Sequence, residues 1–498
     1  MQNRVLLYNT LSPLVFQIVT ILCGFILPKL ILVHFGSDVN GLINSIGQFL
    51  GVIAFFELGV GAVVQTSLYK PLAEKDFEGI SCIISSANSF FKKLGYALLI
   101  YVFIIVCVYP VLVTQEFGFW YITTLTIVIS IRAFAQYFFG IVNRLLLLAD
   151  QKGYIQYNAQ TIAIIVNTVL CYLLILMNYS VQVIYGMTSL VFLIQPYLIH
   201  LYIKKHYRIN TNITCNVEPI SQKWNAMAQH IAAFVLDGTD IVVLSLFSSL
   251  ENVSIYSIYM LVIKGVKQLF LSMIGGIEAL IGNLWAKQES EELKRVFSWA
   301  EWIIHTTVIF FFTVTAVLIA PFVEVFTSGI SDADYFQPIF GVTIVLAYAI
   351  YCLSLPYLIM ILAVGHYKQT QYKFVVAAVI NIVISVICVK QFGLIGVALG
   401  TLAAMAYQTA WMAWYNSKNF IQWPMKNFFK QITVDTVSAV GIFAVGSYFS
   451  LSAIGYVSWV ILAMKVTTCG IIVGAIVNYV FYKEYMMKIA QKVAKRLR

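Results

Sequence analysis

The sequence predicts an all-α polytopic membrane protein, and composition, segment length and charge placement each support this class. Of the 498 residues, 61% are hydrophobic and 10% are charged, and the mean hydropathy is +0.87. A water-soluble domain carries about 25% charged residues. Apolar runs long enough to span a bilayer, about 20 residues each, recur along the whole chain. We therefore expect about fourteen transmembrane helices.

The expected spans fall into three groups along the chain. The first six centre near residues 20, 55, 103, 134, 166 and 193, the next six near 238, 268, 313, 351, 382 and 404, and a final pair near 441 and 469. The first run, from about Leu6 to Phe35, is too long for the apolar core of a signal peptide, which is about 7–15 residues. It is expected to stay as a helix.

The predicted domains follow these groups. Residues 1–205 form an N-terminal six-helix lobe, 206–225 a polar cytoplasmic linker, and 226–418 a C-terminal six-helix lobe. Residues 419–498 add two helices and a basic tail.

Short matches about 214 residues apart indicate that the two lobes are repeats. The stretch from Leu148 to Asn167 resembles the stretch from Leu362 to Asn381, and Pro110 corresponds to Pro321. Six helices is an even number, so the repeats are expected to be parallel, related by an axis along the membrane normal.

The basic residues predict the orientation. Most of the 31 Lys and Arg fall in alternate connections and in the C-terminal tail, whereas the remaining connections carry mainly acids. By the positive-inside rule both termini are cytoplasmic. The net charge of +10 is then a topology signal, and no nucleic-acid partner is expected.

Several cations lie within the expected spans, where a charge at the bilayer centre costs roughly 2.5–3.5 kcal/mol. Arg132, Lys264 and Lys267 fall near the midplane, and Lys29 lies nearer the outer surface. Arg132 shares a helix face with Gln136 and Asn143 by spacing. An anionic ligand in a polar cavity between the halves would compensate these charges.

Acids occur at comparable depth: Glu57, Asp237, Asp240 and Glu278. They are candidates for ion pairs within the cavity, for example Asp240 with Lys264, or for binding a coupling proton or Na⁺. No cofactor, catalytic residue or metal site is expected. His230 and His305, near the inner ends of their spans, are interpreted as helix-end residues with satisfied hydrogen bonds.

The segments "FGSDVNGLINSIGQFLGVIAFFELGVGAVVQTSLYKPLAEKD" (35–76), "GTDIVVLSLF" and "VSIYSIYMLVIKGVKQLF…IEALIGNLWAKQE" resemble the Wzx-type oligosaccharide flippases of the polysaccharide transport group. These belong to the MOP superfamily with MurJ flippases and MATE antiporters. Lys29 departs from the pattern, because relatives often carry Arg there, and lysine lacks the bidentate fork of arginine.

The resemblance implies a function and partners. The substrate would be a polyprenyl diphosphate, such as undecaprenyl diphosphate, carrying an oligosaccharide repeat unit for a capsule or O-antigen-like polysaccharide. It would pass from the cytoplasmic to the outer leaflet of a bacterial plasma membrane by alternating access. Substrate-binding residues would be Lys29, Arg132, Lys264 and Lys267. A polysaccharide polymerase, assembly proteins and membrane lipids are the expected partners.

Two alternative functions share the fold. A MATE-like multidrug antiporter would need a midplane richer in acids, because its substrates are often cationic. A MurJ-like lipid II flippase differs only in the sugar headgroup. A membrane enzyme is disfavoured, because the sequence shows neither a large outer loop nor a His/Asp catalytic constellation.

Overall fold

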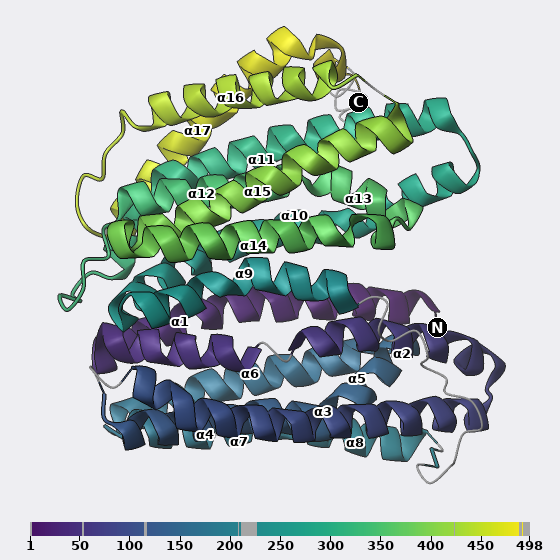
Figure 1. Cartoon of the computed structure of the whole chain (residues 1–498), viewed down its shortest axis with the longest axis vertical. Helices are drawn as coiled ribbons and strands as arrows, with labels where there is room; N and C mark the ends of the chain where they lie inside the picture. Colours follow the sequence, from purple (N-terminus) through teal and green to yellow (C-terminus); the bar gives the residue numbers. More distant parts are fainter. Residues whose placement is uncertain are drawn as a thin grey trace. The chain divides into compact units, whose positions relative to one another are not determined.

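The computed structural model describes residues 2–51, 54–113, 117–207, 209–210, 227–422, 424–487 and 491. Within these ranges the chain is helical and contains no strand, which confirms the predicted all-α class (Figure 1). The helices are α1 (Gln2–Gly51), α2 (Ala54–Glu74), α3 (Phe77–Leu112), α4 (Phe119–Ala135), η1 (Gln136–Gly140), α5 (Ile141–Ala149), α6 (Gly153–Leu176), α7 (Val181–Val191), α8 (Ile194–His206), α9 (Met227–Phe247), α10 (Leu250–Ala286), α11 (Ser290–Phe326), α12 (Pro338–Leu353), α13 (Leu355–Val364), α14 (Tyr367–Phe392), α15 (Leu394–Asn416), η2 (Ser417–Ile421), α16 (Lys426–Gly446) and α17 (Tyr456–Phe481).

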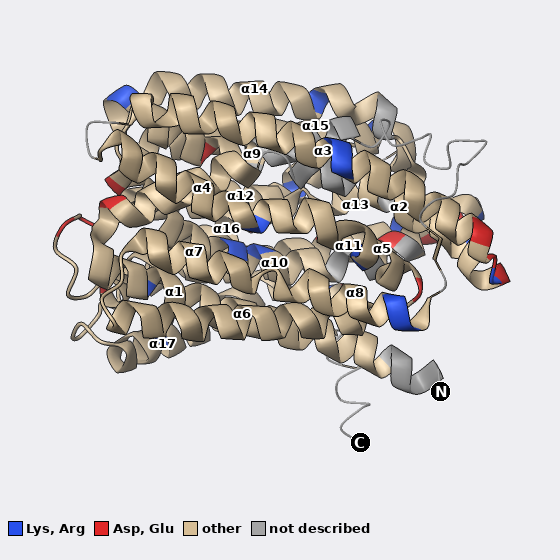
Figure 2. Ribbon diagram, turned by 90° about the horizontal axis from the view of Figure 1, so that it is seen from below, with Lys and Arg blue, Asp and Glu red and all other residues tan. Residues whose placement is uncertain are grey.

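Twelve helices of the described residues are long and apolar enough to cross a membrane. Figure 2 shows long uncharged stretches along the helices, with the acidic residues mostly near their ends. The chain is therefore a multi-pass membrane protein. The two other expected spans fall on α2 and α9, whose side chains are described only in part, so the count of fourteen stays a prediction.

The first expected span ends at a kink inside α1. Gly36 has φ 84° and ψ 176°, and it joins two helices across a kink. This backbone region is open essentially only to glycine. The first span thus ends after Phe35, as its apolar run predicts. The helix that follows Gly36 reaches Gly51, and α2 begins at Ala54.

The order of elements repeats along the chain at the predicted spacing. α3 begins at Phe77 and α11 at Ser290, while α6 begins at Gly153 and α14 at Tyr367. Both α3 and α11 contain an internal proline toward the C-terminal end, Pro110 and Pro321. The fourth span of each repeat is interrupted, by the π-helix η1 in the first and by Ser354 between α12 and α13 in the second.

The chain divides into two compact units, residues 1–254 and 255–498. In the first, α1 packs on α6, α3 on α4, and α4 on α7, while α9 packs on α1 and α2. The predicted boundaries at 205 and 226 stay predictions, because most of the linker lies outside the described residues. Close packing at the start of α10 involves Gly41, where an added Cβ would lie 1.8 Å from the Leu250 carbonyl oxygen.

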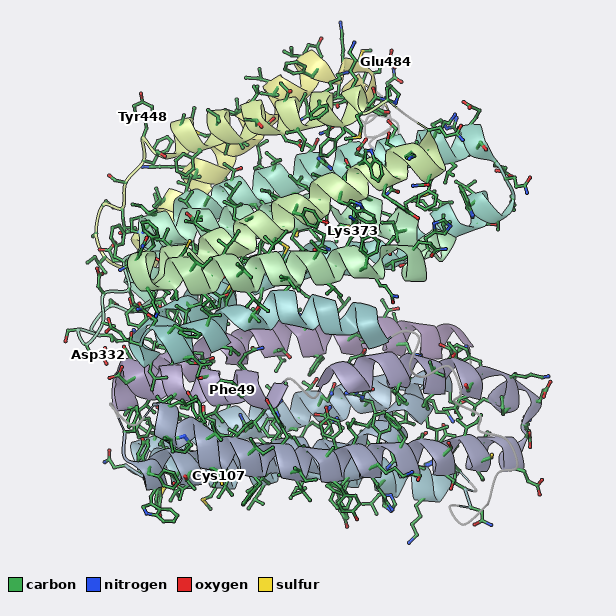
Figure 3. All side chains as sticks on the ribbon, in the orientation of Figure 1. Phe49, Cys107, Asp332, Lys373, Tyr448 and Glu484 are labelled. Carbon is green, nitrogen blue, oxygen red and sulfur yellow. The ribbon has the colours of Figure 1, made fainter. Side chains whose placement is uncertain are left out.

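In the second unit, α11 is a central helix that packs on α12, α16 and α17, and α15 packs on α12 and α14. The last two helices, α16 and α17, pack on each other and on α11. Their apolar contact with α11 includes Leu318, Leu462 and Val466, all buried. Figure 3 shows Asp332 and Tyr448 at one end of this unit and Glu484 at the other.

Candidate functional site

A small polar cavity of about 90 Å³ lies inside the first unit. Its polar lining consists of two arginines and three glutamines from α4, η1, α5, α6 and α8, and we call it the arginine cavity: Arg132, Gln136, Arg144, Gln160 and Gln195. No described lining residue is an acid. The cavity therefore offers positive charge and amide donors within the membrane-spanning part of the unit.

The π-helix η1 determines which residues share this cavity. A π-turn closes i→i+5 hydrogen bonds and so inserts one residue relative to an α-helix. The face that begins with Arg132 and Gln136 therefore continues to Arg144, not to Asn143 as regular spacing predicted. Asn143 lines a different cavity. The sequence analysis did not select Arg144, because the extra residue is invisible to helical periodicity.

Arg132 is positioned by an aromatic ring as well as by its helix. Its guanidinium carbon lies 3.8 Å from the centroid of the Phe192 ring, a cation–π contact. Arg132 is exposed, while Arg144 is half-buried. A guanidinium held on one face and open on its edge can bind an oxyanion through two parallel N–H donors.

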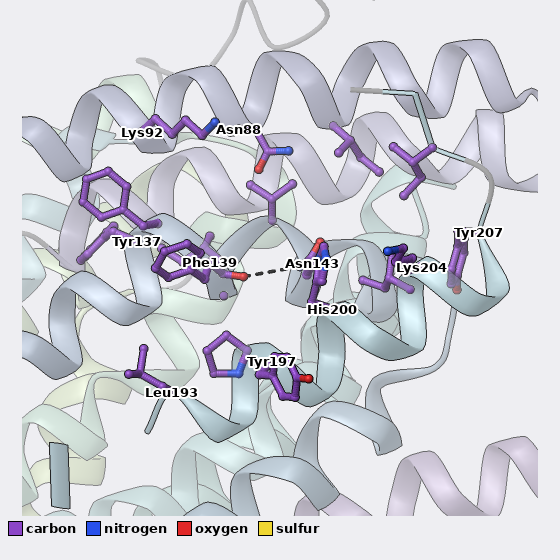
Figure 4. Close-up of a pocket in the computed structure, with 18 of the residues that line it drawn as sticks. Asn88, Lys92, Tyr137, Phe139, Asn143, Leu193, Tyr197, His200, Lys204 and Tyr207 are labelled. Atoms are coloured by element: carbon purple, nitrogen blue, oxygen red, sulfur yellow. Dashed lines mark hydrogen bonds between the residues drawn. The ribbon is translucent and has the colours of Figure 1, made fainter. Parts of the chain in front are cut away.

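A larger cavity of about 960 Å³ lies on the other side of η1 and shares Gly140 and Pro196 with the arginine cavity. Figure 4 shows aromatic and basic side chains of α3, η1 and α8 around this cavity, with Asn143 of α5 beside them. The aromatic rings are those of Tyr137, Phe138, Phe139, Tyr197 and Tyr207, and the basic groups are Lys92, His200 and Lys204. The described lining holds no acid, so this cavity suits an amphiphile with polar or anionic groups.

Tyr207 closes one edge of the large cavity. Its hydroxyl donates to Asp150, which also forms a 2.7 Å ion pair with Lys152. Burial raises the pKa of Tyr207, and the hydrogen bond to Asp150 raises it further, so the phenol stays protonated at neutral pH. The α5–α6 turn is thereby tied to the end of α8.

The predicted lysines of α10 have different surroundings. Lys267 is 7% exposed, and its Nζ lies 4.3 Å and 5.2 Å from the ring centroids of Tyr351 and Tyr348. Lys264, one turn earlier, is exposed. The two lysines thus differ, because Lys267 is buried and Lys264 is accessible.

The remaining predicted residues are placed as follows. Lys29 is half-buried on α1 before the kink, and Glu278 is half-buried on α10. Asp240 is 1% exposed on α9. The side chains of Glu57 and Asp237 lie outside the described residues. The roles assigned to all of these residues, and the predicted cavity between the lobes, stay predictions.

One polar cluster was missed by sequence reasoning. Glu301, His305, Tyr357, Gln431 and Asp435, from α11, α13 and α16, form a buried hydrogen-bonded group in the second unit. His305 lies inside α11, so its interpretation as a helix-end residue is wrong, whereas the side chain of His230 lies outside the described residues. We call this group the α11–α16 cluster.

The chain has the fold of membrane transporters of the MOP superfamily. The lipid II flippase MurJ, in its inward closed conformation, is similar over 96% of this chain and 99% of its own, with a TM-score of 0.74 and 14% identity. An inward-facing MATE multidrug transporter covers 80% of this chain and 94% of its own, with a TM-score of 0.64 and 15% identity. A MOP superfamily transporter from Pyrococcus furiosus is similar over 83% of this chain and 95% of its own, with a TM-score of 0.58 and 14% identity. No protein-family model matches the sequence, and no curated protein is significantly similar to it.

Proposed function

We propose that this chain is a flippase for polyprenyl-diphosphate-linked oligosaccharides and moves them from the cytoplasmic to the outer leaflet by alternating access. The arginine cavity is the observation that carries this proposal. It places two guanidinium groups and three amides inside a membrane-spanning unit, with no described acid in its lining. A diphosphate would bind the two guanidinium groups through charge-assisted hydrogen bonds.

The neighbouring large cavity supports the proposal that the transported headgroup contains sugars as well as phosphate. Its wall of tyrosine and phenylalanine rings gives the flat apolar faces against which sugar rings pack, and Lys92, His200 and Lys204 add polar contacts. In this proposal the oligosaccharide lies next to the diphosphate, on the opposite side of η1. The chain then acts in transport and carries out no covalent chemistry.

A MurJ-like lipid II flippase is the second candidate, because the similar MurJ structure covers nearly the whole chain. Such a substrate also carries a diphosphate, so the arginine cavity would serve it equally. A MATE-like multidrug antiporter is disfavoured by the same cavity, since a cationic drug would meet Arg132 and Arg144.

The test is transport by the purified full-length chain in proteoliposomes. Three probes are compared: a polyprenyl diphosphate with an oligosaccharide, lipid II, and a lipophilic cationic dye. A soluble glycosidase reports how much of each glycolipid has moved to the accessible leaflet. Transport of the oligosaccharide substrate supports the proposal, preferential transport of lipid II selects the second candidate, and transport of the dye alone contradicts both.

The variants Arg132→Ala and Arg144→Ala test whether the arginine cavity binds the diphosphate. Loss of one hydrogen bond to a charged group costs about 1.5–3 kcal/mol, or roughly ten- to hundredfold weaker capture of the diphosphate. Arg132→Lys should keep part of the activity, since it retains charge but not the bidentate fork. Arg295→Ala is the control, because Arg295 is exposed and pairs with Glu292 on the surface. Wild-type transport by both cavity variants would place the diphosphate elsewhere.

A further inference from the structure

The α11–α16 cluster holds three ionisable groups that the proposed transport function does not use. His305 Nδ1 lies 2.6 Å from Asp435 Oδ2, and the Tyr357 hydroxyl donates to Glu301 over 2.5 Å. His305 is 0% exposed, Asp435 4% and Glu301 8%. These groups are therefore shielded from water and lie within helices that span the membrane.

The cluster lies where the C-terminal helix pair meets the rest of the second unit. Gln431 Nε2 donates to the second Asp435 oxygen at 2.9 Å, and the Tyr482 hydroxyl contacts Gln431 Oε1 at 2.5 Å. One turn away, Trp302 donates to Asn478 of α17 at 2.8 Å. The remaining contacts of the pair with α11 include an apolar group and hydrogen bonds made by Asn478 and Trp459 of α17. His305 and Asp435 supply a hydrogen bond between α11 and α16.

Charge balance requires protons in this cluster. Two carboxylates and a neutral imidazole would carry two negative charges, and among the described residues no lysine or arginine pairs with them. The groups that face the cluster are Glu301 and His305 of α11, Tyr357 of α13, Gln431 and Asp435 of α16, and Tyr482 and Tyr485 after α17, with Lys430 at the edge, 4.9 Å from the Tyr482 ring. Uncompensated charge in a membrane is costly, so the neutral cluster holds one proton on the imidazole and one on a carboxyl group.

The second ring nitrogen of His305 marks where a proton binds. Nε2 is buried and makes no hydrogen bond within the described part of the chain. The main-chain group of Leu353 faces the ring without meeting the geometry of a hydrogen bond. When Nδ1–H donates to Asp435, the free lone pair of Nε2 is available to accept a proton, which leaves an imidazolium beside the carboxylate.

We propose that Glu301, His305 and Asp435 form a proton-binding site that attaches the α16–α17 pair to α11. The protonated imidazole holds Asp435 across the helix interface. When the imidazolium loses this proton, the Asp435 carboxylate no longer faces a cation, and α16 is held on α11 more weakly. The ligand is a proton, and the inference does not depend on which substrate the chain transports.

The experiment follows thermal unfolding of the full-length chain in nanodiscs from mildly acidic to mildly alkaline pH. The melting temperature of the wild type should fall as pH rises, because the proton that stabilises the α11–α16 interface is lost. His305→Gln and Asp435→Asn should abolish this dependence. Glu291→Gln, an exposed residue of the same helix, should retain it. A wild-type melting temperature that ignores pH, or a dependence that persists in His305→Gln, overturns the proposal.

A second measurement keeps the inference testable where a variant does not fold. Tyr357→Phe retains every ionisable carboxyl and imidazole group but removes the hydroxyl that contacts Glu301, and it should shift the midpoint of the pH curve by about one unit. In parallel, pH-difference infrared spectra of the wild type should show a protonated carboxyl band that Glu301→Gln or Asp435→Asn lacks. Absence of that band from the wild type, with an unshifted midpoint in Tyr357→Phe, would identify a static hydrogen-bonded network instead.

Discussion

Lys267 shows how a single cation is accommodated inside this protein. Its Nζ lies against the Tyr351 and Tyr348 rings of α12, and 7% of the residue is exposed. The negative faces of aromatic rings stabilise a cation, more strongly when water is excluded. Lys267 therefore has a structural contact with these rings, whereas Lys264 is exposed and is the more accessible of the two to a ligand.

A double-mutant cycle between Lys267→Met and Tyr351→Leu measures this contact. We expect a coupling free energy of about 0.5–2 kcal/mol, in the range of cation–π pairs. Thermal or denaturant unfolding of the purified chain gives the four stabilities. The same cycle with Tyr448→Leu, in an exposed loop, should give no coupling. Additive effects of Lys267→Met and Tyr351→Leu would show that the rings do not stabilise the charge.

The contacts of single residues were the hardest feature to predict from the sequence. The charges within spans were evident, but His305 and Asp435 are 130 residues apart, and no local pattern joins them. Glu301 and His305 are four residues apart on one face of an apolar helix, which could have indicated a shared polar site. The cavity partner Arg144 was missed for a different reason, because η1 changes the register.

At the scale of elements, glycine positions determine which helices approach most closely. A Cβ added at Gly400 would lie 2.1 Å from Ser385 Oγ and 2.8 Å from the Asn381 carbonyl oxygen. α14 and α15 therefore pack backbone to backbone, as small residues allow in membranes. The same interface contains a 2.9 Å hydrogen bond from Asn381 to Thr401.

Gly400→Ala should destabilise the α14–α15 pair, since the methyl group has no space and the helices must separate. The expected loss is about 1–3 kcal/mol of unfolding free energy, the usual cost of overpacking. Gly474→Ala is the matched control, because nothing lies within 4 Å of a Cβ at that position. Melting temperatures of the two variants in the same detergent provide the comparison, and equal values would contradict the close approach.

Element boundaries were predictable where composition changes and unpredictable where only backbone geometry changes. The expected spans correspond to observed helices, and the 214-residue spacing matches the repeated elements. The π-helix η1 and the interruption at Ser354 leave no signal in hydrophobic periodicity, because each alters the helix without changing its apolar character. As a result, the face shared by Arg132 and Gln136 was extended to the wrong residue.

At the scale of the whole molecule, the orientation of the chain in the membrane is a prediction that labelling can test. Single cysteines at Ser331, Ser452 and Ser290, placed in a background without native cysteines, test it because all three positions are exposed. Basic residues around Ser290 predict that it faces the cytoplasm. An impermeant thiol reagent added to intact cells should label Ser331→Cys and Ser452→Cys but not Ser290→Cys. Labelling of Ser290→Cys from outside would reverse the topology.

The global features that composition determines were predictable, namely a membrane protein made of helices with an internal repeat. The packing of helices within each compact unit depends on many weak contacts, and no sequence pattern specifies these. The similar solved structures share the fold at about 14–15% identity. A fold can therefore persist while the residues that choose a substrate change.

The α11–α16 cluster also has a consequence for biosynthesis. Helices enter the membrane in the order of their translation, so Glu301 and His305 reach the bilayer about 130 residues before Asp435. Until α16 arrives, the polar face of α11 has neither its carboxylate partner nor the cover of α17. Nascent chains paused after α15 would thus present ionisable groups to lipid or to the insertion machinery. The arrival of the last two helices therefore completes the burial of this polar face of α11.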